Sequence, residues 1–403
     1  MFKIRQKLLA ILGAGIITLS SVTSVSAINY SSDAYISVQN YDTYLNLILP
    51  KKIKEFQAGK TNIKLEDLIN EYVGYSLPNY LQANGLYDSY EVSGLFKLCN
   101  YDGNDVDKYI LIISKDKNMI ASLTVGFTGN NIVSAFRVEN IPEVNESIKT
   151  NSPMIFGYSN NCFLLYSNDK FSIIENVYNT DTKFIEELNV NQDALNEYSA
   201  EAIAGTTSVV SERSMASSHY VSGITIVPNA VCPDTNVGLC WTACVACMAK
   251  QNNSTGTFSA LSVYNDCKTY TGTDKPNDGE TYPHGSVAWT KLALKIEGIY
   301  PTTDTSALTA SQIGSILDAG KPILVRVFPN TSVDDGHGLV LFNYIENTST
   351  NGTYIFMDPA SPSTAGILSI NVGSNVLNNG DNLILVSRDN NTYSNWRTSI
   401  YKS

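Results

Sequence analysis

Three side chains that are far apart in the sequence could together perform nucleophilic catalysis: Cys240, His337 and Asp358. Cys240 opens the apolar run CWTACVACMAK, which predicts a helix whose first turn would stabilise a thiolate through its free amides and its dipole. His337 stands between glycines at the start of a predicted strand, and Asp358 ends another, YIFM, just before a proline. A base that takes the thiol proton, and a carboxylate that orients this base, would make Cys240 a nucleophile for acyl transfer.

Each of these residues also has an ordinary structural explanation. A cysteine at a helix start can be a small buried hydrophobe, and an aspartate before proline often forms a turn. A single histidine is usually structural. His337 stands apart because the other two histidines lie elsewhere, His219 in a predicted linker and His284 in a YPHGS loop. The hypothesis therefore depends on the combination and order of the three motifs.

That combination resembles the papain-like cysteine peptidases over residues 224–403. The runs CWTAC, GHGLVLFNY and YIFMDP are most similar to bacterial members of the bacteriocin-leader-processing and staphopain-like groups. The resemblance implies a papain-like α+β domain, with a helical half and an antiparallel β half. It also implies Cys240 as nucleophile, His337 as base, Asp358 as the residue that orients the base, a peptide or protein substrate, and no cofactor.

The oxyanion hole is the point at which the chain departs from this family. Such enzymes place a glutamine side chain shortly before the nucleophile, and the residue at that position here is Asp234. An ionised carboxylate would repel the developing oxyanion, so the nearest upstream amide, Asn236, is the substitute candidate. Loss of one such donor costs about 3 kcal/mol of transition-state stabilisation, which predicts a slow or inactive enzyme if no other group replaces it.

The elements around these residues predict an α+β catalytic domain over residues 220–403. Its helices are expected at 240–251, 259–270, 287–297 and 310–319, and its strands at 323–328, 338–344, 354–357 and 383–386. Helices that precede strands in the chain are typical of an α+β domain rather than of a doubly wound sheet.

The N-terminal half, residues 28–199, is predicted to be a sheet-rich α+β domain. It is helical over about 40–81, and short β-branched or aromatic segments follow at 108–113, 120–125, 154–158 and 163–166. Part of it resembles the propeptides of secreted streptopain-like and staphopain-like zymogens. The resemblance implies a prodomain that inhibits the enzyme by covering its cleft, and the alternative is an independent adhesion or binding module. Residues 200–219 read as an exposed linker and processing region.

The chain start and its charge limit the possible partners. Lys3, Arg5 and Lys7 precede an apolar run and a small-residue site at Ala27, which predicts that residues 1–27 are a secretory signal peptide. We therefore expect a secreted, extracellular protein, and the family resemblance implies a bacterial, Gram-positive source. We also expect no membrane span, because the apolar run is shorter than the ~20 residues that a bilayer requires. A net charge of −11 argues against a nucleic-acid partner, and a monomer is expected.

Five of the cysteines allow other interpretations. Cys240, Cys244 and Cys247 have a spacing also used for iron–sulfur clusters, but a helical run in an exported chain favours inward packing of the last two, so no metal is predicted. Cys232 and Cys267 could form a disulfide or remain thiols. Two further classes stay open: a catalytically weak or inactive papain-like binding protein, and an amidase-type or transglutaminase-type acyl transferase.

Overall fold

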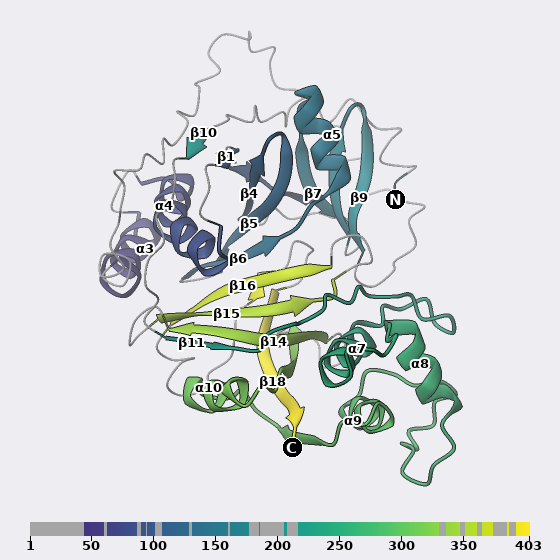
Figure 1. Ribbon diagram of the computed structural model, residues 1–403. Helices are drawn as coiled ribbons and strands as arrows, with labels where there is room; N and C mark the ends of the chain where they lie inside the picture. The colour runs from purple at the N-terminus through teal and green to yellow at the C-terminus, as the bar shows by residue number, and fades with distance from the viewer. Residues whose placement is uncertain are drawn as a thin grey trace.

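The computed structural model describes residues 44–59, 63–86, 90–93, 95–100, 107–128, 131–159, 162–176, 185, 205–207, 217–329, 336–346, 351–360, 365–373, 385–386 and 392–403. The predicted signal peptide and most of the predicted linker lie outside this part of the chain. The protein has helices and a large antiparallel sheet, which confirms the predicted α+β class. Its N-terminal and C-terminal halves lie one above the other in Figure 1.

The N-terminal half begins with helices that cover one face of its sheet. A π-helical turn, η1 (Tyr44–Ile48), leads into α3 (Leu49–Gln57), and α4 (Leu65–Ala83) follows. Buried side chains of α4 such as Leu68 and Tyr72 recur at helical spacing. The helices and the sheet share one apolar core, so the predicted helical segment does form the start of this half.

The long strand β4 (Lys108–Lys115) in the main sheet of the N-terminal half is buried on both faces. The main sheet contains β1 (Tyr90–Val92), β2 (Phe96–Lys97), β4 (Lys108–Lys115), β5 (Asn118–Thr128) and β6 (Asn131–Val138). Within β4, Leu111 and Ile113 pack in the core with the helices, whereas Ile110 and Ile112 pack in a second core on the other face. The second core also includes α5 (Pro142–Thr150) and a small sheet of β3 (Cys99–Asn100), β7 (Ile155–Ser159), β8 (Cys162–Ser167) and β9 (Lys170–Asn176).

Four helices of the C-terminal half are α7 (Cys240–Asn252), α8 (Ala260–Thr269), α9 (Val287–Ile296) and α10 (Ala310–Asp318). The last three begin where the sequence predicts because the side chains of Ser259, Ser286 and Thr309 accept hydrogen bonds from first-turn amides. The strands are β11 (Ser217–Tyr220), β12 (Pro301–Asp304), β13 (Ile323–Pro329), β14 (His337–Glu346), β15 (Asn351–Asp358), β16 (Gly366–Gly373), β17 (Leu385–Val386) and β18 (Thr392–Lys402).

The two halves share one sheet, because the edge strand β6 of the first half pairs with β16 of the second (Figure 1). The sheet therefore runs in the order β4-β5-β6-β16-β15-β14-β13-β18-β12. The backbone amide of Asn371 also donates to the hydroxyl of Tyr80 at 3.0 Å. The described parts of the predicted linker are strands as well: β10 (Gly205–Thr207) pairs with β1, and β11 pairs with β14.

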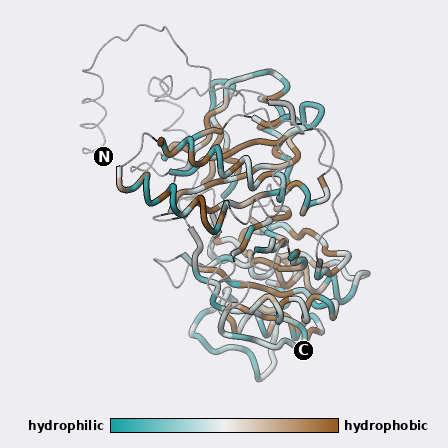
Figure 2. Tube along the Cα trace, turned by 90° about the vertical axis from the view of Figure 1, so that its left-hand side faces the viewer, coloured by the Kyte–Doolittle hydropathy of each residue, from teal (hydrophilic) through white to brown (hydrophobic). Residues whose placement is uncertain are grey.

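Hydropathy follows this arrangement. Figure 2 shows apolar stretches running through the inner strands of both halves, whereas hydrophilic stretches lie mostly along outer helices and loops. Among the helices in the described ranges, none has both the length and the apolar composition that crossing a bilayer requires.

Candidate functional site

Cys240 is the first residue of α7 and lines a cavity of about 430 Å³, which we call the Cys240 cavity. The residue before it, Leu239, makes no side-chain capping hydrogen bond to the helix. The first-turn amides of α7 consequently have no side-chain cap, and they can stabilise negative charge on the sulfur or on a bound oxyanion. The side chain of Cys240 is only partly exposed.

His337 is brought to this helix start by its position as the first residue of β14. A glycine follows it for a steric reason, because a Cβ on Gly338 would lie 3.2 Å from the sulfur of Cys244 and 3.6 Å from the carbonyl oxygen of Cys240. Side-chain atoms are rarely that close to sulfur. Gly338 thus allows α7 to lie directly against β14, and it brings the imidazole beside the thiol.

Asp358 is the last residue of β15, the strand that pairs with β14. Its Oδ1 lies 2.7 Å from Nε2 of His337 and also accepts a hydrogen bond from the backbone amide of Ala360 at 2.8 Å. Ala360 has a positive φ of 32°, so the chain turns sharply after Pro359. Asp358 therefore forms the turn and holds the histidine at the same time.

The electrostatics of the site favour an ionised cysteine and histidine. Burial alone would raise the pKa of the Cys240 thiol, but a hydrogen bond with His337, the charge of that ring and the amide of Gly338 lower it. Burial alone would lower the pKa of His337, whereas Asp358 and Cys240 raise it to about 10. Because Asp358 occupies Nε2, Nδ1 is the nitrogen left to interact with the thiol. These contacts therefore favour a thiolate beside an imidazolium.

Three stretches of the chain form the walls of the Cys240 cavity. They are residues 232, 235 and 237–241 before and at the start of α7, residues 282–287 before and at the start of α9, and residues 326, 328 and 336–338 of β13 and β14. Arg326 lies on β13 opposite Gly338, and its guanidinium lies over the ring of Phe328, 5.1 Å from the ring centre. Its positive charge also lowers the pKa of Cys240.

The YPHGS loop forms one wall because Asp278 anchors it to α9. The carboxylate of Asp278 accepts from the indole N–H of Trp289 and lies 2.9 Å from Nε2 of His284. Gly285 permits a close approach to the nucleophile's neighbour, since a Cβ there would lie 3.1 Å from Cδ1 of Trp241. His284 lines the cavity, although its loop lacks the strand-start setting that distinguishes His337 in the sequence.

The two residues predicted for the oxyanion hole are not brought to the cavity. Asp234 is held by Lys268 at 2.7 Å and accepts a hydrogen bond from the hydroxyl of Tyr264. Asn236 adopts a left-handed turn conformation with φ 57°. Neither belongs to the described residues that line the Cys240 cavity, whereas their neighbours Thr235 and Val237 do line it. The amides at the start of α7 are the remaining candidates for oxyanion stabilisation.

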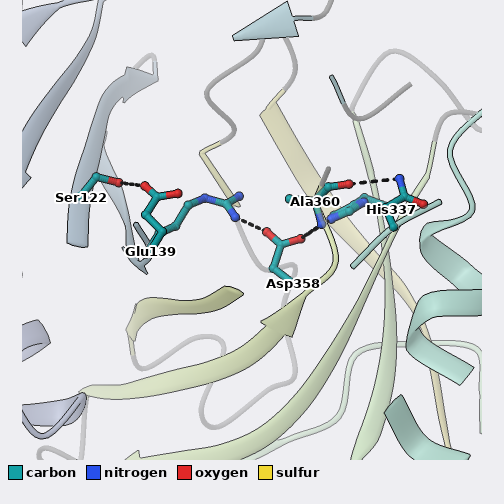
Figure 3. A network of polar contacts seen from close by, with 7 residues as sticks. Ser122, Glu139, His337, Asp358 and Ala360 are labelled. Atoms are coloured by element: carbon teal, nitrogen blue, oxygen red, sulfur yellow. Dashed lines mark hydrogen bonds and ion pairs between the residues drawn. The ribbon is translucent and has the colours of Figure 1, made fainter. Parts of the chain in front are cut away.

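A contact from the N-terminal half was not predicted. Arg137 of β6 forms an ion pair with Oδ2 of Asp358. Glu139, which directly follows β6, accepts a hydrogen bond from the hydroxyl of Ser122. Figure 3 shows Ser122 and Glu139 on one side of Asp358, and Ala360 and His337 on the other. Among the described residues, none of the N-terminal half lines the Cys240 cavity, so a prodomain that covers the cleft stays a prediction.

The other cysteines of this region are not all alike. Burial would raise the pKa of the Cys232 thiol, which lines the Cys240 cavity, but hydrogen bonds with Thr235 and Tyr264 lower it. Cys244 and Cys247 are fully buried, as predicted, and burial raises the pKa of Cys247 to about 12. Cys232 and Cys267 are thiols that no disulfide joins. Within the described residues, no three His, Cys, Asp or Glu side chains are grouped as metal ligands.

The sequence could have indicated some of the missed residues but not others. His284 and the loop around it carry a Pro-His-Gly-Ser run directly before a helix, which is a recognisable signal. Arg137 stands 221 positions before Asp358 in an apolar strand, where no motif marks it. Comparison of the whole chain with models of protein families and with curated proteins found no match, so any functional assignment rests on the geometry of this site.

Proposed function

We propose that the protein is a papain-like cysteine peptidase that hydrolyses peptide bonds through a thioester. The observation that carries this proposal is that Cys240 and His337 both line the Cys240 cavity while the buried Asp358 binds the imidazole, with the pKa of the thiol lowered and that of the imidazole raised. A perturbed thiol and imidazole in a cavity are typical of catalytic sites.

The proposed reaction uses each residue in turn. The thiolate of Cys240 attacks the peptide carbonyl carbon, and amides at the start of α7 stabilise the oxyanion. The imidazolium of His337 then gives its Nδ1 proton to the leaving amine, which forms the thioester. His337 next takes a proton from water, the resulting hydroxide attacks the thioester, and the acid product leaves. Asp358 holds the ring through Nε2 during both steps and stabilises its charged form.

Substitution of Cys240 by serine tests this function. We expect C240S to abolish the cleavage of fluorescein-labelled casein and to abolish alkylation by iodoacetamide at pH ~6, where an ordinary thiol of pKa near ~8.5 reacts slowly. The matched control is C247S, which removes a buried thiol from the same helix and should keep both activities. Casein cleavage that persists in C240S would exclude Cys240 as the nucleophile.

The results of the alkylation and cleavage assays also distinguish a peptidase from the other two classes of protein. Rapid alkylation of Cys240 without peptide cleavage would indicate an amidase-type or transglutaminase-type enzyme, and profiling with small amides and with amine acceptors would identify it. Slow alkylation together with no turnover would indicate a binding protein that retains the fold as a scaffold.

A further inference from the structure

The carboxylate of Asp358 is held by the two halves of the protein at once. One oxygen, Oδ1, serves His337 and the amide of Ala360, at 2.7 and 2.8 Å. The other, Oδ2, accepts from Nη1 of Arg137, which belongs to the N-terminal half. A carboxylate that is fixed at both oxygens cannot rotate about its side-chain bond, so the orientation of His337 depends indirectly on Arg137.

The ion pair is fully removed from water. The side chains of Arg137 and Asp358 are 6% and 0% exposed, and a buried charge is tolerated only when it is paired. Arg137 is fixed by the sheet itself, because it lies opposite Leu368 in the pairing of β6 with β16. The negative charges of Glu175 and Glu139 also raise the pKa of Arg137. Asp358 without Arg137 would be a buried carboxylate with only the imidazolium to balance it.

The charge of Arg137 adds to this geometry. Burial would raise the pKa of Asp358, but Arg137 first and His337 second keep it well below its ordinary value, so the carboxylate stays ionised. The charged and titratable groups around it are Arg137 on β6, His337 on β14 and the thiol of Cys244 on α7. Of these, Arg137 is the one whose charge does not change between pH 4 and 10, because an arginine stays protonated up to a pH of about 12.

We propose that Arg137 is a positioning residue for the catalytic carboxylate, so that the N-terminal half completes the active site instead of only covering it. The inference rests on the peptidase function proposed above. It predicts that the working enzyme retains its N-terminal half, whether or not the linker is cut. The paired strands β6 and β16 and the bond from Asn371 to Tyr80 would hold the halves together after a cut.

Substitutions in the full-length protein test the role of Arg137. We expect R137Q to lower kcat for labelled casein by about 10- to 100-fold with little change in KM, as is typical when a residue that orients a catalytic group is lost. We expect R137K, which keeps the charge, to recover part of the rate. Loss of the cation should also move the acid limb of Cys240 alkylation by iodoacetamide to higher pH. Arg137 keeps Asp358 ionised, and the ionised carboxylate supports the imidazolium that lowers the pKa of the thiol.

The matched control is Y80F, which removes one contact between the halves without touching Asp358. It should leave the pH profile unchanged. The inference is overturned if R137Q has the rate and the pH profile of the unsubstituted protein, or if Y80F shifts the profile as much as R137Q does. The alkylation measurement does not require peptide cleavage, so it still tests Arg137 if the peptidase proposal itself fails.

Limited trypsin digestion of the full chain gives a second test, because Arg213 in the predicted linker is a trypsin site by sequence. We expect the two fragments to elute together in gel filtration and Cys240 to be alkylated at the uncut rate. If the C-terminal fragment separates and is alkylated and cleaves casein as fast as the uncut protein, the N-terminal half is a removable prodomain and the inference is wrong.

Discussion

Nε2 of His337 lies 2.7 Å from Oδ1 of Asp358, and this contact fixes which ring nitrogen can act on Cys240. With Nε2–H donated to the carboxylate, Nδ1 is the nitrogen that would exchange a proton with the thiol in the proposed reaction. The carboxylate stabilises the imidazolium, which in turn favours the thiolate.

The pH dependence of alkylation follows from these contacts. The pKa of Cys240 is lowered, so we expect iodoacetamide to react with it already near pH ~6, below the ordinary thiol pKa of ~8.5. The pKa of His337 is raised to about 10, so the imidazolium should persist through neutral pH and be lost as the pH rises through 10. Casein turnover that needs this proton should fall over the same range.

The variant H337N is the direct control for that profile. Without the imidazolium, the acid limb of Cys240 alkylation should move up towards ~8.5. H284N removes the other histidine of the cavity and should leave the limb in place. Equal shifts in the two variants would contradict the assignment of His337 as the partner of the thiol.

Asp234 should be dispensable for catalysis. Its carboxylate is held by Lys268 and Tyr264, away from the cavity, so D234N should leave kcat for labelled casein unchanged. Removal of a real oxyanion donor would instead lower kcat about 10²- to 10³-fold. Because the pair with Lys268 is partly exposed, its loss should lower the free energy of unfolding in urea only slightly. The variant K268M should show the same loss of stability.

Gly338 should tolerate no side chain. We expect G338A to lower the free energy of unfolding by about 1–3 kcal/mol, and to slow Cys240 alkylation, since its Cβ would crowd Cys244 and push α7 away from β14. The matched strand glycine is Gly373, where a Cβ would meet only Oδ1 of Asn351 at 3.9 Å, so G373A should be mild. Truncation of the crowded neighbour in G338A/C244A should restore part of the alkylation rate. No recovery there would refute the steric explanation.

The buried pair of Arg137 and Asp358 should show strong coupling in stability. Each single variant, R137M or D358N, leaves a buried group without its partner and should cost about 3–5 kcal/mol in urea unfolding. The double variant should cost less than the sum, because it removes both charges together. Additive losses would mean that the two side chains do not stabilise each other.

The elements that carry the site were predictable because each has a strong local signal. The apolar helix after Cys240 and the strand after His337 are continuous runs, and both lie where the sequence predicts. By contrast, β18 was missed because its buried Trp396 and Ile400 alternate with polar residues and the register shifts twice along its pairing with β13. A broken alternation hides the period of two that marks a strand.

The contact between the halves could not be predicted from the sequence for a different reason. The prediction of a prodomain followed by an exposed linker assumes that the two halves are separate bodies. The pairing of β6 with β16 instead joins two strand edges that are distant in the chain. Nothing near Arg137 indicates that it meets Asp358, and nothing near Asp234 indicates that it turns towards Lys268. Tertiary packing determines which partners these two side chains contact.

The shared sheet also bears on the order in which the protein is made. During synthesis, domains generally fold from the N-terminus, so β6 can be in place before β16 leaves the ribosome. An open strand edge is a template for pairing, and β16 would be added to it late. The carboxylate that completes the triad would then reach its arginine only after the nucleophile has been synthesised. A chain damaged in its first half would therefore leave Asp358 without its buried cation, and under the proposed function this coupling would limit hydrolysis by incompletely folded molecules.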